Sequence, residues 1–103
     1  MPVIKNEKTK NFTVISNTHL KDRNLSLKAK GLLTQMLSLP YDWEYSISGL
    51  AAINKEGKSA IASALRELLD AGYAFRSQET DEKGQFKRMN YIIFESPQKS
   101  FPQ

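Results

Sequence analysis

The sequence predicts an α+β fold in which three helices precede an antiparallel β-hairpin. Residues 57–72 carry apolar side chains at every third or fourth position, the spacing that gathers them on one face of a helix. A shorter helix is expected over residues 46–53, with a turn between the two. Residues 73–78 and 88–95 show the period-two alternation of paired strands. Helix, short turn, helix and hairpin is the order of elements in a winged helix-turn-helix.

The composition is that of a single globular domain. The 103 residues are 40% hydrophobic and 25% charged, which supports a modest core and argues against wholesale disorder. The formal net charge of +4 is a mild basic bias, compatible with a polyanionic partner. The absence of cysteine excludes disulfides and cysteine-based zinc sites and favours a reducing compartment. No apolar stretch approaches the length of a transmembrane helix, so we expect a cytoplasmic protein without a membrane partner.

The N-terminal quarter is expected to contribute an arm, one strand and a loop. Residues 1–11 are basic, and we interpret them as a flexible arm that is either solvated or in contact with DNA. Residues 12–15 (Phe-Thr-Val-Ile) favour a short strand, which would add a third member to the sheet of the hairpin. In the polar stretch that follows, Leu20 is the expected anchor, and His19 is expected at the surface. A single histidine without a second ligand nearby is no metal site.

Ser26 is the expected N-cap of a first helix that runs to about residue 39, where Pro40 prevents continuation. The expected buried face of this helix comprises Ala29, Leu32, Leu33, Met36 and Leu37. The expected outward face comprises Lys28, Lys30, Thr34 and Gln35. Gly31 costs this helix roughly 1 kcal/mol relative to alanine, so we expect another element to approach it closely.

An aromatic segment precedes the second helix. Its Trp43 is interpreted as a plug of the core, with nucleobase stacking as the alternative. Ser46 and Ser48 are both candidate caps, so the start of the helix is uncertain by a residue or two. The residues expected to face inward are Ile47, Leu50, Ala51 and Ile53.

Two glycines bound the third helix. Gly57 can serve as its N-cap, and Gly72 lies where a left-handed residue ends a helix. The expected buried face comprises Ile61, Ala64, Leu65, Leu68 and Leu69. Residues 79–85 connect the two strands as the tip of the wing, and Gly84 supplies the positive φ that a hairpin turn needs. Residues 97–103 are expected to form a linker or tail.

The residues needed for catalysis are not found together. Gly57-Lys58-Ser59 resembles the end of a phosphate-binding loop, but the glycine required five residues earlier is replaced by Ala52. One histidine in a polar segment cannot form a Ser/His/Asp triad, and the paired carboxylates lie in charged turns typical of solvated loops. We therefore expect no enzyme, no cofactor and no metal.

The basic residues favour double-stranded DNA as the partner. One group surrounds the start and outward face of the third helix, and a second belongs to the hairpin; in a winged helix both face the same duplex. The helix N-terminus adds its dipole and free amides for phosphate. The predicted DNA-binding residues are Lys55, Lys58, Ser59, Ala62, Ser63, Arg66, Lys83, Lys87 and Arg88. The alternative is a solvated helix face, since Glu56, Glu79, Asp81 and Glu82 lie nearby.

Four motifs carry a family resemblance. They are residues 26–32 (Ser-Leu-Lys-Ala-Lys-Gly-Leu), 37–40 (Leu-Ser-Leu-Pro), 57–61 (Gly-Lys-Ser-Ala-Ile) and 64–73 (Ala-Leu-Arg-Glu-Leu, ending in Ala-Gly-Tyr). From residue 12 to about residue 97 the chain resembles the N-terminal winged-helix domain of bacterial phage replisome-organiser and plasmid or mobile-element replication-initiator proteins. Most of the last motif, from Leu-Arg-Glu-Leu to the final Gly-Tyr (residues 65–73), is shared with many winged-helix repressors.

The resemblance implies origin binding or assembly of a replication complex, with a helicase or its loader among the partners and a homo-oligomer as a further one. It places the recognition positions on Lys58, Ser59, Ala62, Ser63 and Arg66. Related helices often carry a long polar or basic residue where this chain has Ala62. Members of the family continue into further domains, so this chain is expected to be a fragment or a short form.

We thus expect residues 12–96 to form a winged-helix DNA-binding domain that acts in replication initiation. A winged-helix transcription regulator is the alternative, and it would need dimerisation to read a palindrome. A second alternative is a protein-assembly module of the same fold that does not contact DNA.

Overall fold

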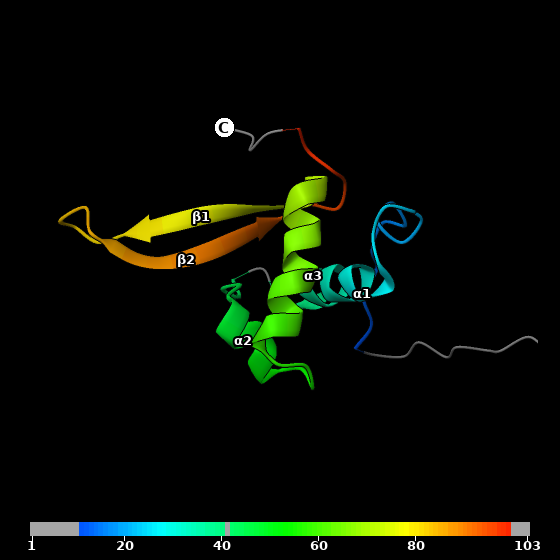
Figure 1. The fold of residues 1–103 in the computed structure, drawn as a ribbon, viewed down its shortest axis with the longest axis horizontal. Helices are drawn as coiled ribbons and strands as arrows, with labels where there is room; N and C mark the ends of the chain where they lie inside the picture. The colour runs from blue at the N-terminus through cyan, green and yellow to red at the C-terminus, as the bar shows by residue number, and fades with distance from the viewer. Residues whose placement is uncertain (1–10, 41, 100–103) are drawn as a thin grey trace, which may run out of the picture.

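The protein is an α+β domain of three helices and a two-stranded antiparallel sheet (Figure 1). The computed structural model describes residues 11–40 and 42–99, apart from the side chains of residues 79 and 86–88. The elements are α1 (Leu27–Ser38), α2 (Ile47–Ala52), α3 (Lys58–Ala71), β1 (Ala74–Thr80) and β2 (Phe86–Ile93). The expected arm, up to residue 10, and the last four residues of the expected tail lie outside the described residues.

Local signals set the beginning and end of α1. The Ser26 hydroxyl accepts a hydrogen bond from the Ala29 amide at 3.1 Å, as expected for an N-cap. Glu67 of α3 accepts hydrogen bonds from the Ser26 amide at 2.9 Å and from its hydroxyl at 2.7 Å. These bonds lower the pKa of Glu67 because they stabilise the carboxylate. The same residue that starts α1 therefore also fixes it to α3.

The caps of α2 and α3 follow the sequence. Ser46 accepts from the Gly49 amide at 3.0 Å, which settles the N-cap of α2 in its favour. Gly57 is the N-cap of α3, and Gly72 ends it in the left-handed region with φ at 87°. A side chain at residue 72 would also collide with the backbone carbonyl of Gln98. Both glycines were predicted at these positions.

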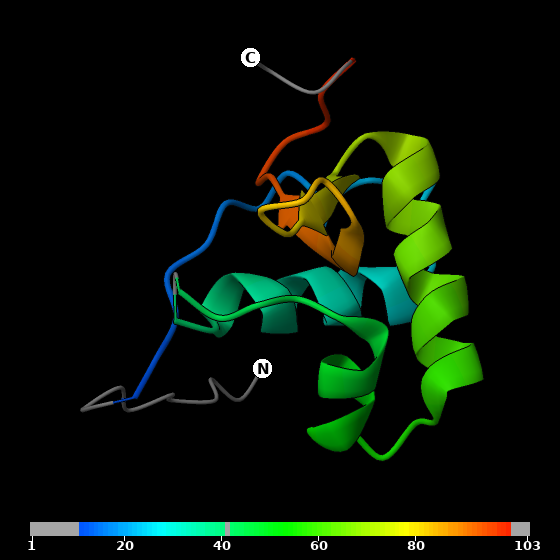
Figure 2. The ribbon, with the colours of Figure 1, turned by 90° about the vertical axis from the view of Figure 1, so that its left-hand side faces the viewer.

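The core lies between the helices. Figure 2 shows α1 crossing beside α3, with α2 packed against α3 near the beginning of that helix. The large side chains fully buried here are Leu33, Met36, Leu50, Leu65, Leu68 and Tyr73. The predicted stripes of α1 and α3 are thus confirmed, with Leu37 and Leu69 partly buried at their margins. Trp43 packs against this core and touches the ring of Tyr45, which confirms its role as a plug.

The hairpin leaves the helices and extends away from them (Figure 1). Its register runs from Ala74 opposite Ile93 to Glu79 opposite Arg88, and a one-residue shift follows at Thr80. Asp81 organises the turn, since its carboxylate accepts from the amides of residues 83 and 85, both at 2.9 Å. Gly84 has the expected positive φ, at 78°.

Residues 12–15 are not a strand, contrary to the prediction. The sheet of the described residues has only two members, and Phe12 and Val14 are exposed. A β-branched run forms a strand only when an edge is available to pair with it. No such pairing occurs here, so the expected three-stranded sheet is corrected to two strands.

His19 is buried with 0% exposure, whereas Leu20, the expected anchor, is 42% exposed. The histidine Nε2 lies 2.8 Å from the Thr34 hydroxyl, which itself donates to the Lys30 carbonyl. The Thr34 hydroxyl has one proton, and it donates that proton to the Lys30 carbonyl. It can therefore only accept from His19, so Nε2 of the histidine is the protonated nitrogen and Nδ1 carries the lone pair. The surface assignment was therefore wrong, and Thr34 is half-buried rather than facing out.

Three smaller expectations on the helices also fail. An added Cβ at Gly31 would meet no atom within 4 Å, so no element approaches it. Ile53 is 45% exposed rather than inward. Gln35 is half-buried, because its amide exchanges hydrogen bonds of 3.1 and 2.6 Å with Asn54.

Within the described residues, no helix has the length and apolarity to cross a bilayer.

Candidate nucleic-acid interface

The N-terminal end of α3 is open. Gly57 has extended backbone angles and offers no side chain, and no side chain among the described residues caps this end. The first-turn amides that precede the Ile61–Gly57 hydrogen bond are therefore available to a ligand. Lys58 and Ser59 are exposed beside them. Backbone amides, the helix dipole and a cation together suit an anion such as phosphate.

The outward face of α3 continues from this end. Ser59, Ser63 and Arg66 are exposed, and Ala62 between them is half-buried. The Lys58 and Arg66 side chains make no hydrogen bond or ion pair with any described residue. Their charges are thus available to a partner, as is that of Lys55 in the preceding turn.

A cation from α1 joins this face. The Lys28 ammonium donates to the Ser63 hydroxyl at 3.2 Å. The two residues are 35 positions apart, so only the packing of α1 on α3 brings them together. The sequence carried no signal for Lys28, which was expected simply to face solvent.

The hairpin residues form a separate group. Lys83 is exposed in the turn, at the end of the hairpin that is distant from α3 in Figure 1. The side chains of Lys87 and Arg88 lie outside the described residues, although their backbone belongs to β2. The structure therefore brings the α3 residues together and holds Lys83 apart from them.

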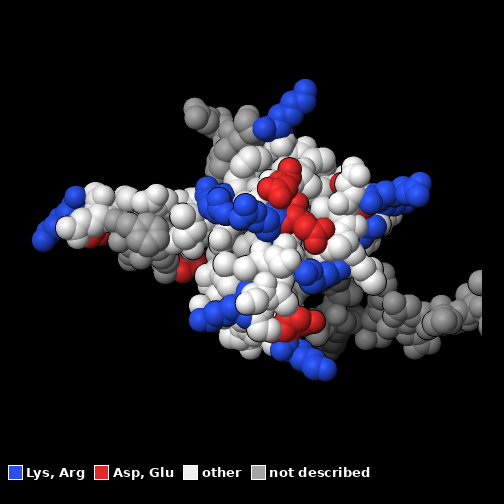
Figure 3. Space-filling model, viewed as in Figure 1, with Lys and Arg blue, Asp and Glu red and all other residues white. Residues whose placement is uncertain are grey.

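Charges of both signs occupy the face of α3. Figure 3 shows Lys and Arg side chains with Asp and Glu side chains between them rather than one continuous basic patch. Glu56 and Asp70 are exposed acids at the two ends of α3. Such a surface can contact phosphates at separate points, but it attracts polyanions less strongly than a uniformly basic one.

In comparisons with known proteins, no family model, no curated protein and no solved structure matches the chain.

At the C-terminal end of α3, the side chains of Tyr73, Asp22 and His19 lie together. The Tyr73 hydroxyl donates to the Asp22 carboxylate at 2.8 Å. Burial, and then this bond, raise the pKa of Tyr73 to about 12, while hydrogen bonds from Asn24 and Tyr73 lower the pKa of Asp22. The ring of His19 contacts Tyr73 edge-on, with the centroids 6.5 Å apart. These groups are ionisable, but each is engaged in holding the N-terminal loop in place.

The described residues offer few other sites. They contain no group of three His, Cys, Asp or Glu side chains that could hold a metal. One groove of about 540 Å³ lies between α1 and α3, and another of about 400 Å³ separates the Trp43 segment from the hairpin.

Proposed function

We propose that this chain is a winged-helix domain that binds double-stranded DNA in the replication initiation of a phage, plasmid or mobile element. In this assignment α2 and α3 form the helix-turn-helix, α3 is the recognition helix, and the hairpin is the wing. The observation that carries the proposal is the open N-terminal end of α3. Its amides, Lys58 and Ser59 are left available there, while the opposite face of the helix is packed in the core.

The contacts would be made mainly to the DNA backbone. Ala62 can touch a thymine methyl group but cannot form a bidentate bond to a base edge, and serine hydroxyls discriminate poorly between bases. Arg66 is the exposed residue of this face with a fork that suits guanine, but it lies two turns from the helix start. The domain alone would therefore show little sequence preference. Origin selection would come from oligomerisation or from a replication partner such as a helicase or its loader.

Two alternatives use the same fold. A transcription regulator would read a palindrome as a dimer. A cytoplasmic protein-assembly module without DNA contact is favoured by one observation, the acids among the bases on the face of α3. We propose a non-enzymatic role in each case, whether the chain is a replication protein, a transcription regulator or an assembly module.

Binding of labelled duplexes by the Lys58→Ala and Lys21→Ala variants tests the proposal. Both residues are exposed lysines, so each variant removes one positive charge, but Lys21 lies in the loop before α1. Lys58→Ala should weaken binding to two unrelated duplexes to the same extent, and Lys21→Ala should not. Ala62→Arg should tighten binding to both. A strong preference for one sequence, above about a thousandfold over random DNA, would contradict the backbone mode.

A further inference from the structure

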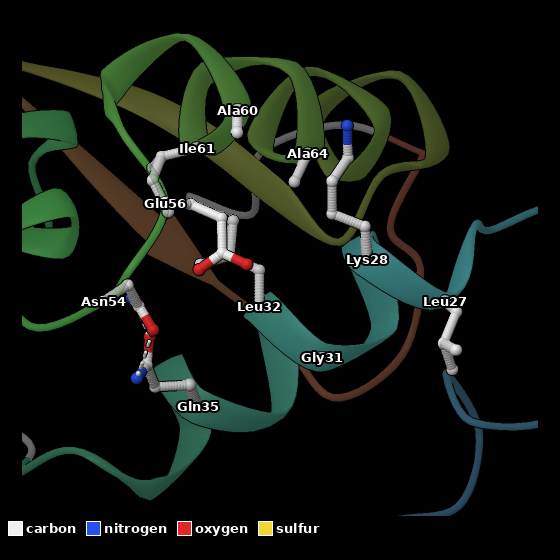
Figure 4. Close-up of a pocket in the computed structure, with 10 residues that line it drawn as sticks. All are labelled: Leu27, Lys28, Gly31, Leu32, Gln35, Asn54, Glu56, Ala60, Ile61 and Ala64. Atoms are coloured by element: carbon white, nitrogen blue, oxygen red, sulfur yellow. Dashed lines mark hydrogen bonds between the residues drawn. The ribbon is translucent and has the colours of Figure 1, made fainter.

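We infer that Lys28 of α1 and Ser63 of α3 together form a second site for a DNA phosphate, in addition to the open end of α3. The inference rests on the proposed function and adds to it a contact from another helix. In Figure 4 the Lys28 side chain extends from α1 toward α3, at one end of the groove between the two helices. Its ammonium donates to the Ser63 hydroxyl at 3.2 Å, and both residues are exposed.

Both side chains keep hydrogen-bond donors for a partner. An ammonium has three N–H donors and no acceptor, so the bond to Ser63 leaves two donors. The Ser63 hydroxyl accepts in this bond and makes no other hydrogen bond with a described residue, so its proton is available. Phosphate oxygens are negatively charged and only accept hydrogen bonds. Donors from two helices therefore meet at one place, and a phosphate can accept from both.

The carboxylate of Glu67 does not pair with this ammonium. Its two oxygens accept from the amide and the hydroxyl of Ser26 at 2.9 and 2.7 Å. Those bonds, and to a smaller extent the charge of Lys28, lower the pKa of Glu67, so the acid acts on the lysine through space. Lys28 nevertheless makes no ion pair with a described residue. The charge of the ammonium is thus partly offset, and its donors stay accessible.

The folding of α1 gives no reason for a cation at residue 28. Lys28 is the second residue of α1, and positive charge is disfavoured at the N-terminal end of a helix. No acid lies in this first turn to compensate for it. A bound phosphate would reverse the balance, because a negative charge is favourable both beside Lys28 and near the start of α1. A partner therefore accounts for this lysine better than the helix does.

The second site would fix how α3 lies against a duplex. Ser63 follows Ser59 by one turn, so the two hydroxyls lie on the same face, about 6 Å apart along the helix axis. The open end contacts one phosphate near Ser59, and Lys28 contacts another near Ser63. One contact lets a helix pivot on the DNA backbone, whereas two contacts fix its direction. Arg66, which is exposed on the same face, is then held in one orientation toward the duplex.

Duplex binding by variants of the full chain tests the inference, with fluorescence anisotropy as the measurement. Lys28→Met removes the ammonium and keeps a long side chain of high helix propensity. It should weaken binding to two unrelated duplexes roughly threefold to tenfold at about 0.1 M salt, and it should reduce the magnitude of the salt slope by about 1. Lys28→Arg keeps the charge and should retain the slope. Lys21→Met, in the loop before α1, is the matched control and should change neither quantity.

Ser63→Ala shows whether the two residues act on the same phosphate. It should weaken binding less than Lys28→Met does, because it removes no charge. The double variant should lose less than the product of the two single effects, since either change disrupts the same contact. The unfolding midpoint of Lys28→Met should not fall, because a lysine is disfavoured at that end of α1.

The failure of the inference can be told from the failure of the proposed function. If the unaltered chain binds duplex and Lys58→Ala weakens that binding, an unchanged affinity and salt slope in Lys28→Met would overturn the inference and leave the proposed function standing. Fully independent losses in the double variant would overturn the shared site. No binding by the unaltered chain at low salt would overturn both.

Discussion

The C-terminal end of α3 is closed by backbone hydrogen bonds, whereas its N-terminal end is left open to solvent. Gly72 turns into the left-handed region, and its carbonyl accepts from the Gln98 amide at 2.8 Å. The next residue, Tyr73, is fully buried and accepts from the Phe94 amide at 2.8 Å. At the other end Gly57 is exposed and contributes no capping side chain, and an added Cβ there would meet nothing within 4 Å.

This difference separates what the helix needs to fold from what it offers to a partner. A serine or aspartate at residue 57 would satisfy a first-turn amide and stabilise the helix. The chain has glycine instead, so the amides remain available for an external acceptor. The closed end fixes the helix against the hairpin, and the open end presents Lys58 and Ser59.

The largest effect is expected from alanine at the two glycines. Gly72→Ala should lower the free energy of unfolding by at least about 2 kcal/mol, because left-handed geometry costs roughly 1–2 kcal/mol and the Gln98 carbonyl must also move. Gly57→Ala should cost less than about 1 kcal/mol, since its φ of −80° suits any residue. Urea unfolding of both variants gives the comparison. Equal losses would show that the two ends are not built differently.

The buried histidine should make stability depend on pH. Burial lowers the pKa of His19 from its ordinary 6.5; Glu95 opposes this shift, and Lys30 adds to it. Below pH 6.5 the histidine of the unfolded chain binds a proton that the buried histidine does not. The free energy of unfolding therefore keeps its full value well above pH 6.5 and falls as the pH drops below 6.5. The loss is at most about 1.4 kcal/mol per pH unit.

Urea unfolding at pH 7.5 and pH 5.5 measures this dependence. His19→Gln keeps a donor for Thr34 and removes the titration, so the difference between the two conditions should shrink. The Asp22 and Glu67 carboxylates also have lowered pKa values, but they titrate below this range. An unchanged difference in His19→Gln would place the acid sensitivity elsewhere.

A cap at residue 57 should produce a smaller and opposite effect. Gly57→Asp should raise the free energy of unfolding by about 0.5–1 kcal/mol, because its carboxylate accepts from the first-turn amides. The same change should weaken duplex binding, since the carboxylate takes the place of a phosphate. Gly57→Ser is the control that caps without a charge and should weaken binding less. Binding unaffected by Gly57→Asp would mean that the open end does not contact DNA.

The helices and the hairpin could be predicted because their signals are local. Ser26, Ser46 and Gly72 act on residues within one turn of themselves, and the apolar periods identify the buried faces. The faces of α3 followed directly from such spacing. These elements were therefore recognised without any knowledge of their neighbours.

The errors concern residues whose environment is set by distant parts of the chain. Residues 12–15 have strand-like composition, but pairing depends on an edge elsewhere. His19 is buried because α1 supplies Thr34, 15 positions later. Lys28 reaches Ser63 only once α1 and α3 are packed together. Composition and spacing carry no information on these contacts, so the predicted interface lacked Lys28.

The salt dependence of duplex binding tests the central claim most directly. If Lys55, Lys58, Lys83, Lys87 and Arg88 contact phosphates, the logarithm of the affinity should fall linearly with the logarithm of salt, with a slope of roughly −3 to −5 for four to five contacts. Lys58→Ala should reduce the magnitude of that slope by about 1, and Lys21→Ala should leave it unchanged. Fluorescence anisotropy on a random-sequence duplex supplies the measurement. Affinity that does not vary with salt, or no binding at low salt, would contradict the proposed function and favour the assembly module.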